Sequence, residues 1–266
     1  MTDPPASQTP VKNPVVPITP RCSLIVPAYN EEAYLPRLLD TVDRARRAYR
    51  GGADLIEVIV ADNASTDATL QIARDRGCRT VSVEKRVIGA VRNGGARAAR
   101  GEILAFIDAD SQIHPETFNE IDRVLAGGPV IGGTTGITFE RRSAGLTCTY
   151  GLLTLLGVVF RGVRGLWDLS VDTGVVFCRR RDFDAISGYR ESHLWGEDVW
   201  LLLDLRRLGW KTGRRLVSGT NAKAIFSTRK FDRHGDWHYF TIPPRLAWQM
   251  LLGRKDMARR YWYDAR

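Results

Sequence analysis

The chain has 266 residues, of which 44% are hydrophobic and 26% are charged. These proportions are typical of a folded protein and exclude collagen-like repeats and wholesale disorder. A chain of this length buries about 70–75% of its unfolded surface, so neither disulfides nor a structural metal is needed for stability.

Positive charge is concentrated in the second half of the chain. Residues 1–140 carry 16 basic and 18 acidic groups, whereas residues 141–266 carry 23 basic and 12 acidic groups, a net of +11. Such a surface suits phosphorylated ligands, an anionic membrane or nucleic acid, although an Arg-rich solvated surface explains it equally. The four cysteines form no CxxC or Cys/His cluster, and no basic-then-apolar leader is present, so we expect a cytoplasmic protein without a zinc site.

The two ends of the chain differ in composition from its middle. Six of the twelve prolines lie in residues 1–20, which predicts a disordered, Pro-rich tail and a folded part that begins near Arg21. Residues 236–266 mix aromatic side chains with Arg and Lys and are predicted to form a basic aromatic helical tail. That tail either lies on a membrane surface or packs against the folded domain.

Between these ends, short apolar runs alternate with amphipathic segments. Strands are predicted at 22–27, 55–61, 80–83 and 103–107, and helices at 31–48, 67–76, 89–100 and from Pro115 onward. Ser65 or Thr66 is expected to cap the second helix. Apolar strands that alternate with helices indicate an α/β fold, with a mostly parallel sheet covered by helices on both faces.

The second half is less regular. Residues 130–139 and 171–178 are predicted strands, and 196–208 is a predicted helix. Residues 143–160 carry no charge and approach the length of a membrane span. Because Gly, Thr and Ser dilute their hydrophobicity, we expect a buried helix or one wall of a ligand site instead.

Polar residues follow three of the predicted strands. Tyr29 and Glu31 come after the first strand, Asp62 after the second, and Asp108 and Asp110 after the fourth. Ligands of parallel sheets bind beyond the carboxyl ends of the strands. The sequence therefore predicts that these side chains converge on one site.

The acidic residues of this set suggest a cation and a nucleoside. Asp108 and Asp110 flank a single alanine, so their charges repel unless a cation or hydrogen-bond donors neutralise them. A divalent cation shared with substrate phosphates is one interpretation, and a solvated turn is the other. Asp62 either accepts hydrogen bonds from a base or ribose, or forms an Asx turn that only shapes its loop.

Two further residues suit a nucleotide. Tyr29 offers a flat face on which a base can stack, and Glu31 is a nearby acceptor. Arg92, with Gly94 and Gly95 close behind it, is either a ligand of a diphosphate or a solvated helix residue.

Glu197 and Asp198 precede an apolar helical stretch. They are either first-turn acids favoured by the helix dipole, or a general base and the acid that orients it. An ordinary Asp has a pKa of about 3.9, so it is ionised at neutral pH and able to accept a proton.

The segment 227–238 is basic. Arg229, Lys230 and Arg233 are candidates for binding a leaving diphosphate, with a solvated basic loop as the alternative. His234 or His238 is a candidate metal ligand.

Taken together, these motifs resemble glycosyltransferase family 2 in their order and spacing. The resemblance rests on Ile25–Glu32, Ala61–Asp67, Arg92–Ala96 and Ala105–Asp110, and on Gly196–Asp198, which resembles the late ED motif of that family. It covers roughly residues 21–210. It implies a GT-A fold over residues 21–235, with a nucleotide-binding half at 21–127 and an acceptor half at 128–235.

The resemblance also implies an activity and residue roles. The activity is an inverting transfer of a sugar from a nucleoside diphosphate donor, for which UDP is favoured, with Mg²⁺ or Mn²⁺ as the cation. The resemblance does not identify the acceptor. The Arg-rich C-terminal part and residues 143–160 favour a lipid-linked compound, with a glycan as the alternative, and a peripheral contact with a membrane, and no nucleic acid partner is expected. The implied roles are nucleotide contact for Pro27, Tyr29 and Glu31, base recognition for Asp62, ribose contact for Asp108, diphosphate-bound metal for Asp110, and general base for Asp198 with Glu197 beside it.

Some features depart from the family pattern or favour other classes. The second loop reads Asp62-Asn-Ala-Ser65 where the family commonly has Asp-Asp-Gly-Ser, and the Gln-x-x-Arg-Trp motif of processive synthases is absent, so a single-transfer enzyme is expected. A nucleotidyltransferase or a dehydrogenase needs a Gly-rich loop after the first strand, where this chain has Ala28-Tyr-Asn-Glu31. A basic nucleic-acid-binding module built on residues 141–266 is the non-enzymatic alternative.

Overall fold

The computed structural model describes residues 19–229, except for 142, 144, 146, 149–150, 152–172 and 194–195. Outside the described residues lie residues 1–18 of the predicted tail at 1–20, the predicted tail at 236–266, most of the uncharged segment 143–160, and Lys230, Arg233, His234 and His238.

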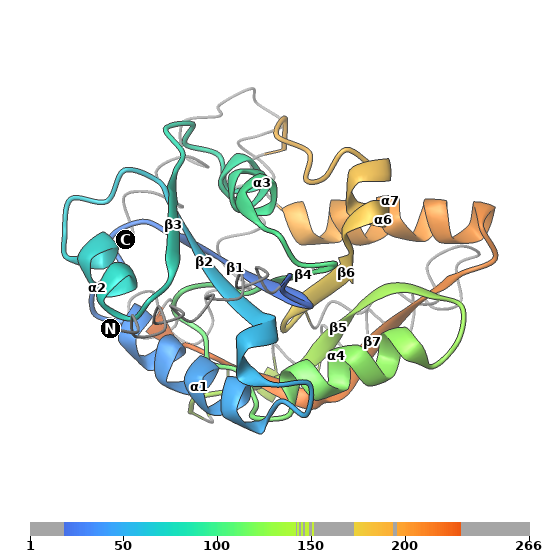
Figure 1. The fold of residues 1–266 in the computed structure, drawn as a ribbon, viewed down its shortest axis with the longest axis horizontal. Coiled ribbons are helices and arrows are strands. Elements are labelled where there is room, and N and C mark those ends of the chain that lie inside the picture. Colours follow the sequence, from blue (N-terminus) through green and yellow to red (C-terminus); the bar gives the residue numbers. More distant parts are fainter. Residues whose placement is uncertain are drawn as a thin grey trace, which may run out of the picture.

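Within the described residues, a sheet of seven strands, in the order β3-β2-β1-β4-β6-β5-β7, forms the centre of the molecule (Figure 1). The strands are β1 (Cys22–Ala28), β2 (Ile56–Asp62), β3 (Arg79–Ser82), β4 (Ile103–Phe106), β5 (Val130–Phe139), β6 (Val176–Arg179) and β7 (Arg215–Phe226). The helices are α1 (Leu35–Ala48), α2 (Thr69–Asp75), α3 (Ile88–Ala98), α4 (Thr117–Ala126), α6 (Arg180–Ala185) and α7 (Glu197–Lys211), with a 3₁₀ turn η1 (Ala53–Leu55).

The predicted α/β architecture is confirmed. Strands β1, β2, β3 and β4 pair in parallel, and every residue of β1, β2 and β4 is buried. Burial on both faces explains why these strands read as nearly continuous apolar runs in the sequence. The helices expected between them are present, with ends that differ from the predicted ones by a few residues.

The second half of the sheet changes direction at β6. This strand is antiparallel to both of its neighbours, β4 and β5, while β7 pairs in parallel with β5. The sheet is therefore mixed, although parallel pairs predominate. Neither β7 nor α6 was expected from the sequence. The apolar residues Leu216, Ala222 and Ala224 of β7 are buried at even positions, so strand periodicity was present but was interrupted by polar residues.

Helices cover both faces of the sheet (Figure 1). Alternate residues of β1, among them Leu24 and Val26, face one apolar cluster that includes α1 and α4. Ile25, between them, faces a second cluster that includes α3, α6 and α7. The strand period of two thus divides the core into two layers.

The sheet opens where the site residues begin. Pairing between β1 and β4 ends at Ile25 and Phe106, with one more hydrogen bond from Ile107 N to Ile25 O. Pro27, which has no N–H to donate, therefore lies beyond the paired part of β1 on the β4 side. From this point the chain segments after β1 and β4 diverge and present Tyr29–Glu31 and Asp108–Asp110 at the same edge.

Close packing of α3 against the sheet explains its glycine pair. A Cβ atom on Gly95 would lie 2.4 Å from Cγ2 of Ile25, and one on Gly94 would lie 2.4 Å from Cγ2 of Val83. The two glycines let the helix approach β1 and the end of β3. Arg92, one turn earlier, is thereby brought to the edge of the sheet.

Candidate active site

The loops that follow β1 and β2 are tied to each other. The backbone N–H of Asn30 donates to Oγ of Ser65 (3.0 Å), and the N–H of Thr66 donates to Oδ1 of Asn30 (2.8 Å). The carboxylate of Asp62, which is 2% exposed, accepts from the N–H of Ser65 at 3.2 and 3.3 Å. Asp62 therefore shapes its own loop, as in the turn interpretation, at the edge where the other candidates gather.

The expectation that Ser65 or Thr66 caps α2 is wrong. The helix begins at Thr69, after Ala68, without a side-chain cap. Instead Asp67 Oδ1 accepts from the N–H of Thr69 (3.0 Å) and from its hydroxyl (2.5 Å). Ser65 and Thr66 instead form hydrogen bonds with Asn30, which link the β2 loop to the β1 loop.

A first ion cluster joins the β1 loop, the β4 loop and Arg229, which lies three residues after the end of β7. Arg229 donates to both carboxylate oxygens of Glu31 (2.9 and 3.2 Å) and to Oδ2 of Asp110 (2.8 Å). Its guanidinium also lies over the ring of Tyr34, 4.5 Å from the centroid. Glu31 is 2% exposed, so its charge is balanced by this arginine rather than by water.

A second ion cluster surrounds Arg92, which is 3% exposed. Its Nη2 donates to Oδ1 of Asp108 (2.8 Å), while its Nη1 lies 3.2 Å from Oε1 of Glu197 and donates to Oδ1 of Asp198. One guanidinium from α3 thus connects the β4 loop with the first turn of α7. The sequence did not predict this arrangement, because nothing in the chain order links residues 92, 108 and 198.

Tyr189, in the loop before α7, completes the second cluster. Its hydroxyl donates to Oδ1 of Asp198 at 2.9 Å, and its ring lies beneath the Arg92 guanidinium, with 5.3 Å between Cζ and the ring centroid. Sequence reasoning missed this residue, since a lone tyrosine in a loop carries no pattern that distinguishes it from a packing residue.

Burial and charge act against each other in the second cluster. Burial disfavours the charge of Arg92, but the attraction of Asp198, Asp108 and Glu197 outweighs it and holds the Arg92 pKa well above its ordinary value. Burial raises the pKa of Glu197, which the neighbouring charge of Asp198 reinforces and that of Arg92 opposes. The side chain of Asp198 is 22% exposed and that of Glu197 is 10% exposed, so the two adjacent acids have different environments.

The two clusters together carry an excess of negative charge. Arg92 and Arg229 face five carboxylates, a formal net charge of −3; the carboxylates are those of Glu31, Asp108, Asp110, Glu197 and Asp198. Carboxylates gathered in this way attract cations or hydrogen-bond donors.

The donor set fits a cation that shares its coordination shell with a ligand. Within the part of the chain that the structure describes, no three His, Cys, Asp or Glu side chains are grouped so as to hold a metal ion by themselves. Asp108 and Asp110 provide hard carboxylate oxygens, and Mg²⁺-type cations commonly use one or two carboxylates together with substrate phosphates and water. Asp110, whose side chain is 16% exposed, is accessible for such a role.

The remaining candidates lie at the same edge. Tyr29 is half-buried, and the guanidinium of Arg86 lies 5.3 Å from its ring centroid. Pro27 is buried within β1 and pairs in register with Ala61 of β2. Three sets of hydrogen bonds lie between Asp62 and Asp198: the first joins Asp62, Ser65 and Asn30, the second joins Glu31, Arg229 and Asp110, and the third joins Asp108, Arg92 and Asp198. The chain itself connects the sets, because Asn30 precedes Glu31 and only Ala109 separates Asp108 from Asp110.

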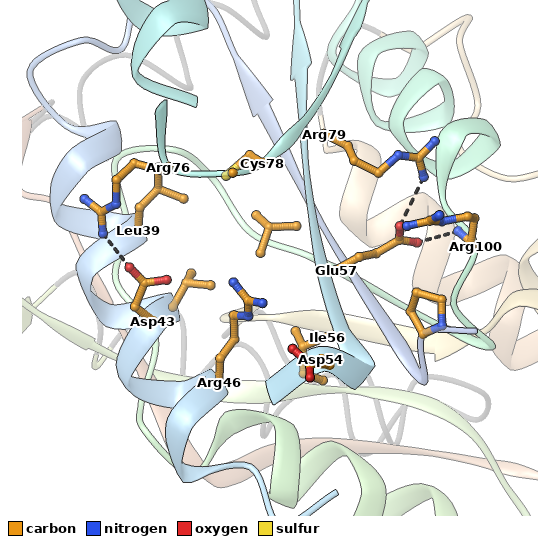
Figure 2. Close-up of a pocket in the computed structure, with 14 residues that line it drawn as sticks. Leu39, Asp43, Arg46, Asp54, Ile56, Glu57, Arg76, Cys78, Arg79 and Arg100 are labelled. Carbon is orange, nitrogen blue, oxygen red and sulfur yellow. Dashed lines mark hydrogen bonds and ion pairs between the residues drawn. The ribbon is translucent and has the colours of Figure 1, made fainter. Parts of the chain in front are cut away.

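A cavity of about 210 Å³ lies at the opposite edge of the sheet, where β2 and β3 begin (Figure 2). Its wall includes Glu57, which pairs with Arg79 and Arg100, and Asp43, which pairs with Arg76. The arginines in this wall already have carboxylate partners. The cavity lies where the strands begin and the candidate site lies where they end, so the two are separate.

The chain is similar in sequence to known proteins over part of its length. The family model described as "Glycosyl transferase family 2" matches residues 23–186. EpsH of Bacillus subtilis is 38% identical over 103 residues, which cover 37% of this chain and 28% of EpsH. The undecaprenyl-phosphate 4-deoxy-4-formamido-L-arabinose transferase of Pseudomonas paraeruginosa is 35% identical over 123 residues, which cover 41% of this chain and 34% of the transferase. The chain thus spans about a third of the length of these relatives.

Solved structures resemble the fold over a longer stretch. Glucosyl-3-phosphoglycerate synthase from Mycobacterium tuberculosis, crystallised with Mn²⁺, UDP and phosphoglyceric acid, superposes with a TM-score of 0.60 and 22% identity. The match covers 86% of this chain and 78% of that one. Among the described residues, no helix has the length and apolar character needed to cross a bilayer.

Proposed function

The chain belongs to glycosyl transferase family 2 and has the GT-A fold, and on that premise we propose that it transfers a hexosyl group, with inversion, from a nucleoside diphosphate sugar to an acceptor hydroxyl. The observation that carries the proposal is the contact between Arg92, Asp108 and Asp198. It connects the donor-side loop after β4 with an acid at the start of α7, as a transfer between two substrates requires.

We assign the donor to the loops after β1, β2 and β4. The residues proposed to contact it are Pro27, Tyr29, Glu31, Asp62 and Asp108, with Arg92 acting on it through Asp108. The half-buried ring of Tyr29 supports stacking of a base, and the tie between the β1 and β2 loops supports a preformed nucleotide site. UDP is our choice of nucleotide, because glucosyl-3-phosphoglycerate synthase, which shares the fold, was crystallised with UDP.

Asp110 is the residue we propose as ligand of Mg²⁺ or Mn²⁺. The formal charge of −3 across the two clusters supports a cation here. Such a cation supplies electrostatic stabilisation of the charge that develops on the leaving diphosphate. Arg229, which bridges Asp110 and Glu31, lies where its guanidinium can also bind a diphosphate oxygen.

Asp198 is the general base in this proposal, and Glu197 is its buried neighbour. Asp198 is the more exposed of the two, so an acceptor hydroxyl can reach it, whereas burial raises the pKa of Glu197 and weakens its charge. Asp198 removes the proton from the acceptor hydroxyl, and the oxygen attacks the anomeric carbon opposite the diphosphate. The bond from that carbon to the diphosphate breaks, a new glycosidic bond forms with inverted configuration, and the proton remains on Asp198.

The acceptor is proposed to be a lipid-linked compound or a glycan. The net charge of +11 in residues 141–266 favours an anionic acceptor or the anionic inner face of a membrane. One relative named above carries undecaprenyl-phosphate in its name, which agrees with a lipid-linked acceptor. We therefore place the protein in the cytoplasm, at the inner face of the membrane.

Calorimetry and product analysis test the proposed function. We expect UDP to bind only weakly without Mn²⁺ and tightly with it, and a donor at a hundredfold its Kd to stabilise the fold by about 2.7 kcal/mol. UDP-glucose, UDP-N-acetylglucosamine and GDP-mannose are then screened for diphosphate release, and NMR reads the anomeric configuration of the product. Failure of every nucleotide to bind in the presence of Mn²⁺ contradicts the proposal. Binding of nucleic acid that weakens steeply with salt favours the alternative, a basic nucleic-acid-binding module.

A further inference from the structure

Two buried donors converge on one oxygen of Asp198. The Tyr189 hydroxyl donates to Oδ1 at 2.9 Å, and Nη1 of Arg92 donates to the same atom. Among the described residues, both of these donors form hydrogen bonds to Oδ1, and no hydrogen bond to Oδ2 is found. The side chain of Asp198 as a whole is 22% exposed, so the carboxylate remains accessible beside these two donors.

We propose that Tyr189 is a positioning residue, which together with Arg92 fixes the carboxylate of Asp198 so that Oδ2 is presented to the acceptor hydroxyl. This inference rests on the proposed function, because it assumes that Asp198 is the base. Tyr189 itself neither gains nor loses a proton in the reaction. The transferred proton goes from the acceptor to Oδ2, while Oδ1 keeps its two hydrogen bonds.

The position of Tyr189 is determined by its backbone as well as by its ring. The side-chain amide of Asn93 donates to the carbonyl of Tyr189 (2.9 Å), and the N–H of Tyr189 donates to Oδ1 of Asn93 (2.9 Å). The ring packs edge-on against Phe106, with 5.1 Å between centroids. Because Arg92 and Asn93 are adjacent on α3, one helix sets the position of both donors to Asp198.

The backbone before Tyr189 leaves little freedom for another arrangement. Gly188 has φ of +69°, and a Cβ atom there would lie 2.6 Å from Oδ1 of Asn93. Burial, reinforced by the charge of Asp198, raises the pKa of Tyr189 well above its ordinary value, which favours the protonated hydroxyl that donates to Asp198. A donor locked in this way lowers the cost of orienting the base at each turnover.

The variant Tyr189→Phe removes the hydroxyl and retains the ring. Loss of a hydrogen bond to a charged group predicts that kcat falls about ten- to hundredfold. We expect the Kd of UDP with Mn²⁺ to be unchanged, because the donor loops keep their contacts. The Tm is expected to fall by no more than the share of this one hydrogen bond, because the ring retains its core packing. The assay is diphosphate release from whichever of the three screened nucleotide sugars the wild-type protein turns over, expressed per UDP-binding molecule.

A matched control distinguishes positioning from a structural role. Tyr49, at the end of α1, also donates its hydroxyl to an aspartate, Asp122 of α4, away from the site. Tyr49→Phe is expected to leave kcat unchanged. Equal losses in Tyr49→Phe and Tyr189→Phe would mean that the effect is one of stability, which overturns the proposal.

A double-mutant cycle with Asp198→Asn completes the test. If Tyr189 acts through Asp198, Tyr189→Phe has no further effect on the residual rate of Asp198→Asn. Independent, multiplicative losses, or a wild-type kcat in Tyr189→Phe while Asp198→Asn is inactive, overturn the positioning role and leave the proposed function intact. A wild-type rate in Asp198→Asn, or no diphosphate release by the wild-type protein, contradicts the proposed function itself and removes the basis of this inference.

Discussion

Both ends of the parallel strands carry carboxylates and arginines, but the ratio of acids to arginines is reversed between them. Where β2 begins, one acid is surrounded by donors: Glu57 accepts from the Ser23 hydroxyl (2.6 Å), from the Gly101 N–H (3.2 Å) and from the side chains of Arg79 and Arg100 (3.1 Å each). Where the strands end, one cation, Arg92, is surrounded by three acids. The first arrangement satisfies its charge within the protein, whereas the second leaves negative charge for a ligand to complete.

Backbone strain is also unequal between the two ends. In the wall of the cavity of Figure 2, Gly77 has a positive φ (+68°), which glycine adopts readily. At the candidate active site, Gly188 (+69°) and Gly196 (+68°) also have a positive φ, and so do two residues that are not glycines, Asn30 (+52°) and Ala64 (+62°). Strain of this kind is found most often at functional sites, so the comparison agrees with the assignment made from charge.

The largest effect is expected from removing the charge of Asp198. Asp198→Asn retains the shape of the side chain but cannot accept a proton, and a lost general base lowers kcat by about 10²–10⁴. Binding of UDP with Mn²⁺ is expected to persist, because within the described part of the chain Asp198 is linked to the donor loops through Arg92 rather than by a direct hydrogen bond. Steady-state rates and calorimetry on the same preparation check this, and a retained turnover rate would show that the base is another group.

A smaller effect is expected when Asp110 becomes alanine. Loss of a metal ligand or its support typically lowers metal affinity about 10–100-fold. Asp110→Ala should therefore weaken Mn²⁺-dependent UDP binding, while Glu31 continues to hold Arg229 in place. Calorimetric titration of UDP with and without Mn²⁺ measures the change, and equal affinity in variant and wild type would exclude Asp110 as the ligand.

At the opposite end, Glu57→Gln tests a structural role. Breaking a fully buried ion pair costs about 3–5 kcal/mol, but water can reach the half-exposed Arg79 and Arg100, so we expect a loss of about 2 kcal/mol in the free energy of unfolding. The kcat of the folded protein should not change. Urea unfolding and rate measurements check both statements, and a lower kcat with full stability would contradict the contrast between the two ends.

The pH dependence of that variant gives a second measure. Burial alone would raise the pKa of Glu57, but hydrogen bonds from Ser23, from the Arg100 amide and from the side chains of Arg79 and Arg100 outweigh it and lower the pKa. A lowered pKa in the folded state means that the stabilisation is complete above the unfolded pKa of about 4.3 and is lost as the pH falls through the folded value. Glu57→Gln should lack this part of the acid-induced loss when unfolding is measured between neutral and acidic pH.

The smallest effect is expected from relieving strain at Ala64. Because the left-handed conformation costs an L-residue about 1–2 kcal/mol and glycine gains flexibility in the unfolded chain, Ala64→Gly should raise stability by no more than about 1 kcal/mol. Thermal unfolding with and without UDP measures it. A destabilised variant would indicate that the methyl group of Ala64 makes a stabilising packing contact in the loop.

The predictability of the fold differed between the two halves for a physical reason. Strands β1, β2 and β4 are buried on both faces, so their apolar runs and the helical periodicity between them identified the α/β alternation locally. β7, which carries Ser218, Thr220 and Asn221 within it, lacked such a run and was not anticipated. The antiparallel insertion of β6 between β4 and β5 depends on pairing between distant segments, which a local pattern does not specify.

For the site, chain order was sufficient to place Glu31, Asp62, Asp108 and Asp110 at one edge, because parallel strands end on the same side of a sheet. Which side chains neutralise them was decided only by tertiary structure. For Arg92 the sequence left open a diphosphate contact and a solvated helix position, and the structure buries it among acids. Arg229 binds both Glu31, which is 198 positions away in sequence, and Asp110. Ion pairs of this kind form between elements that the folded sheet brings together, so no spacing along the chain encodes them.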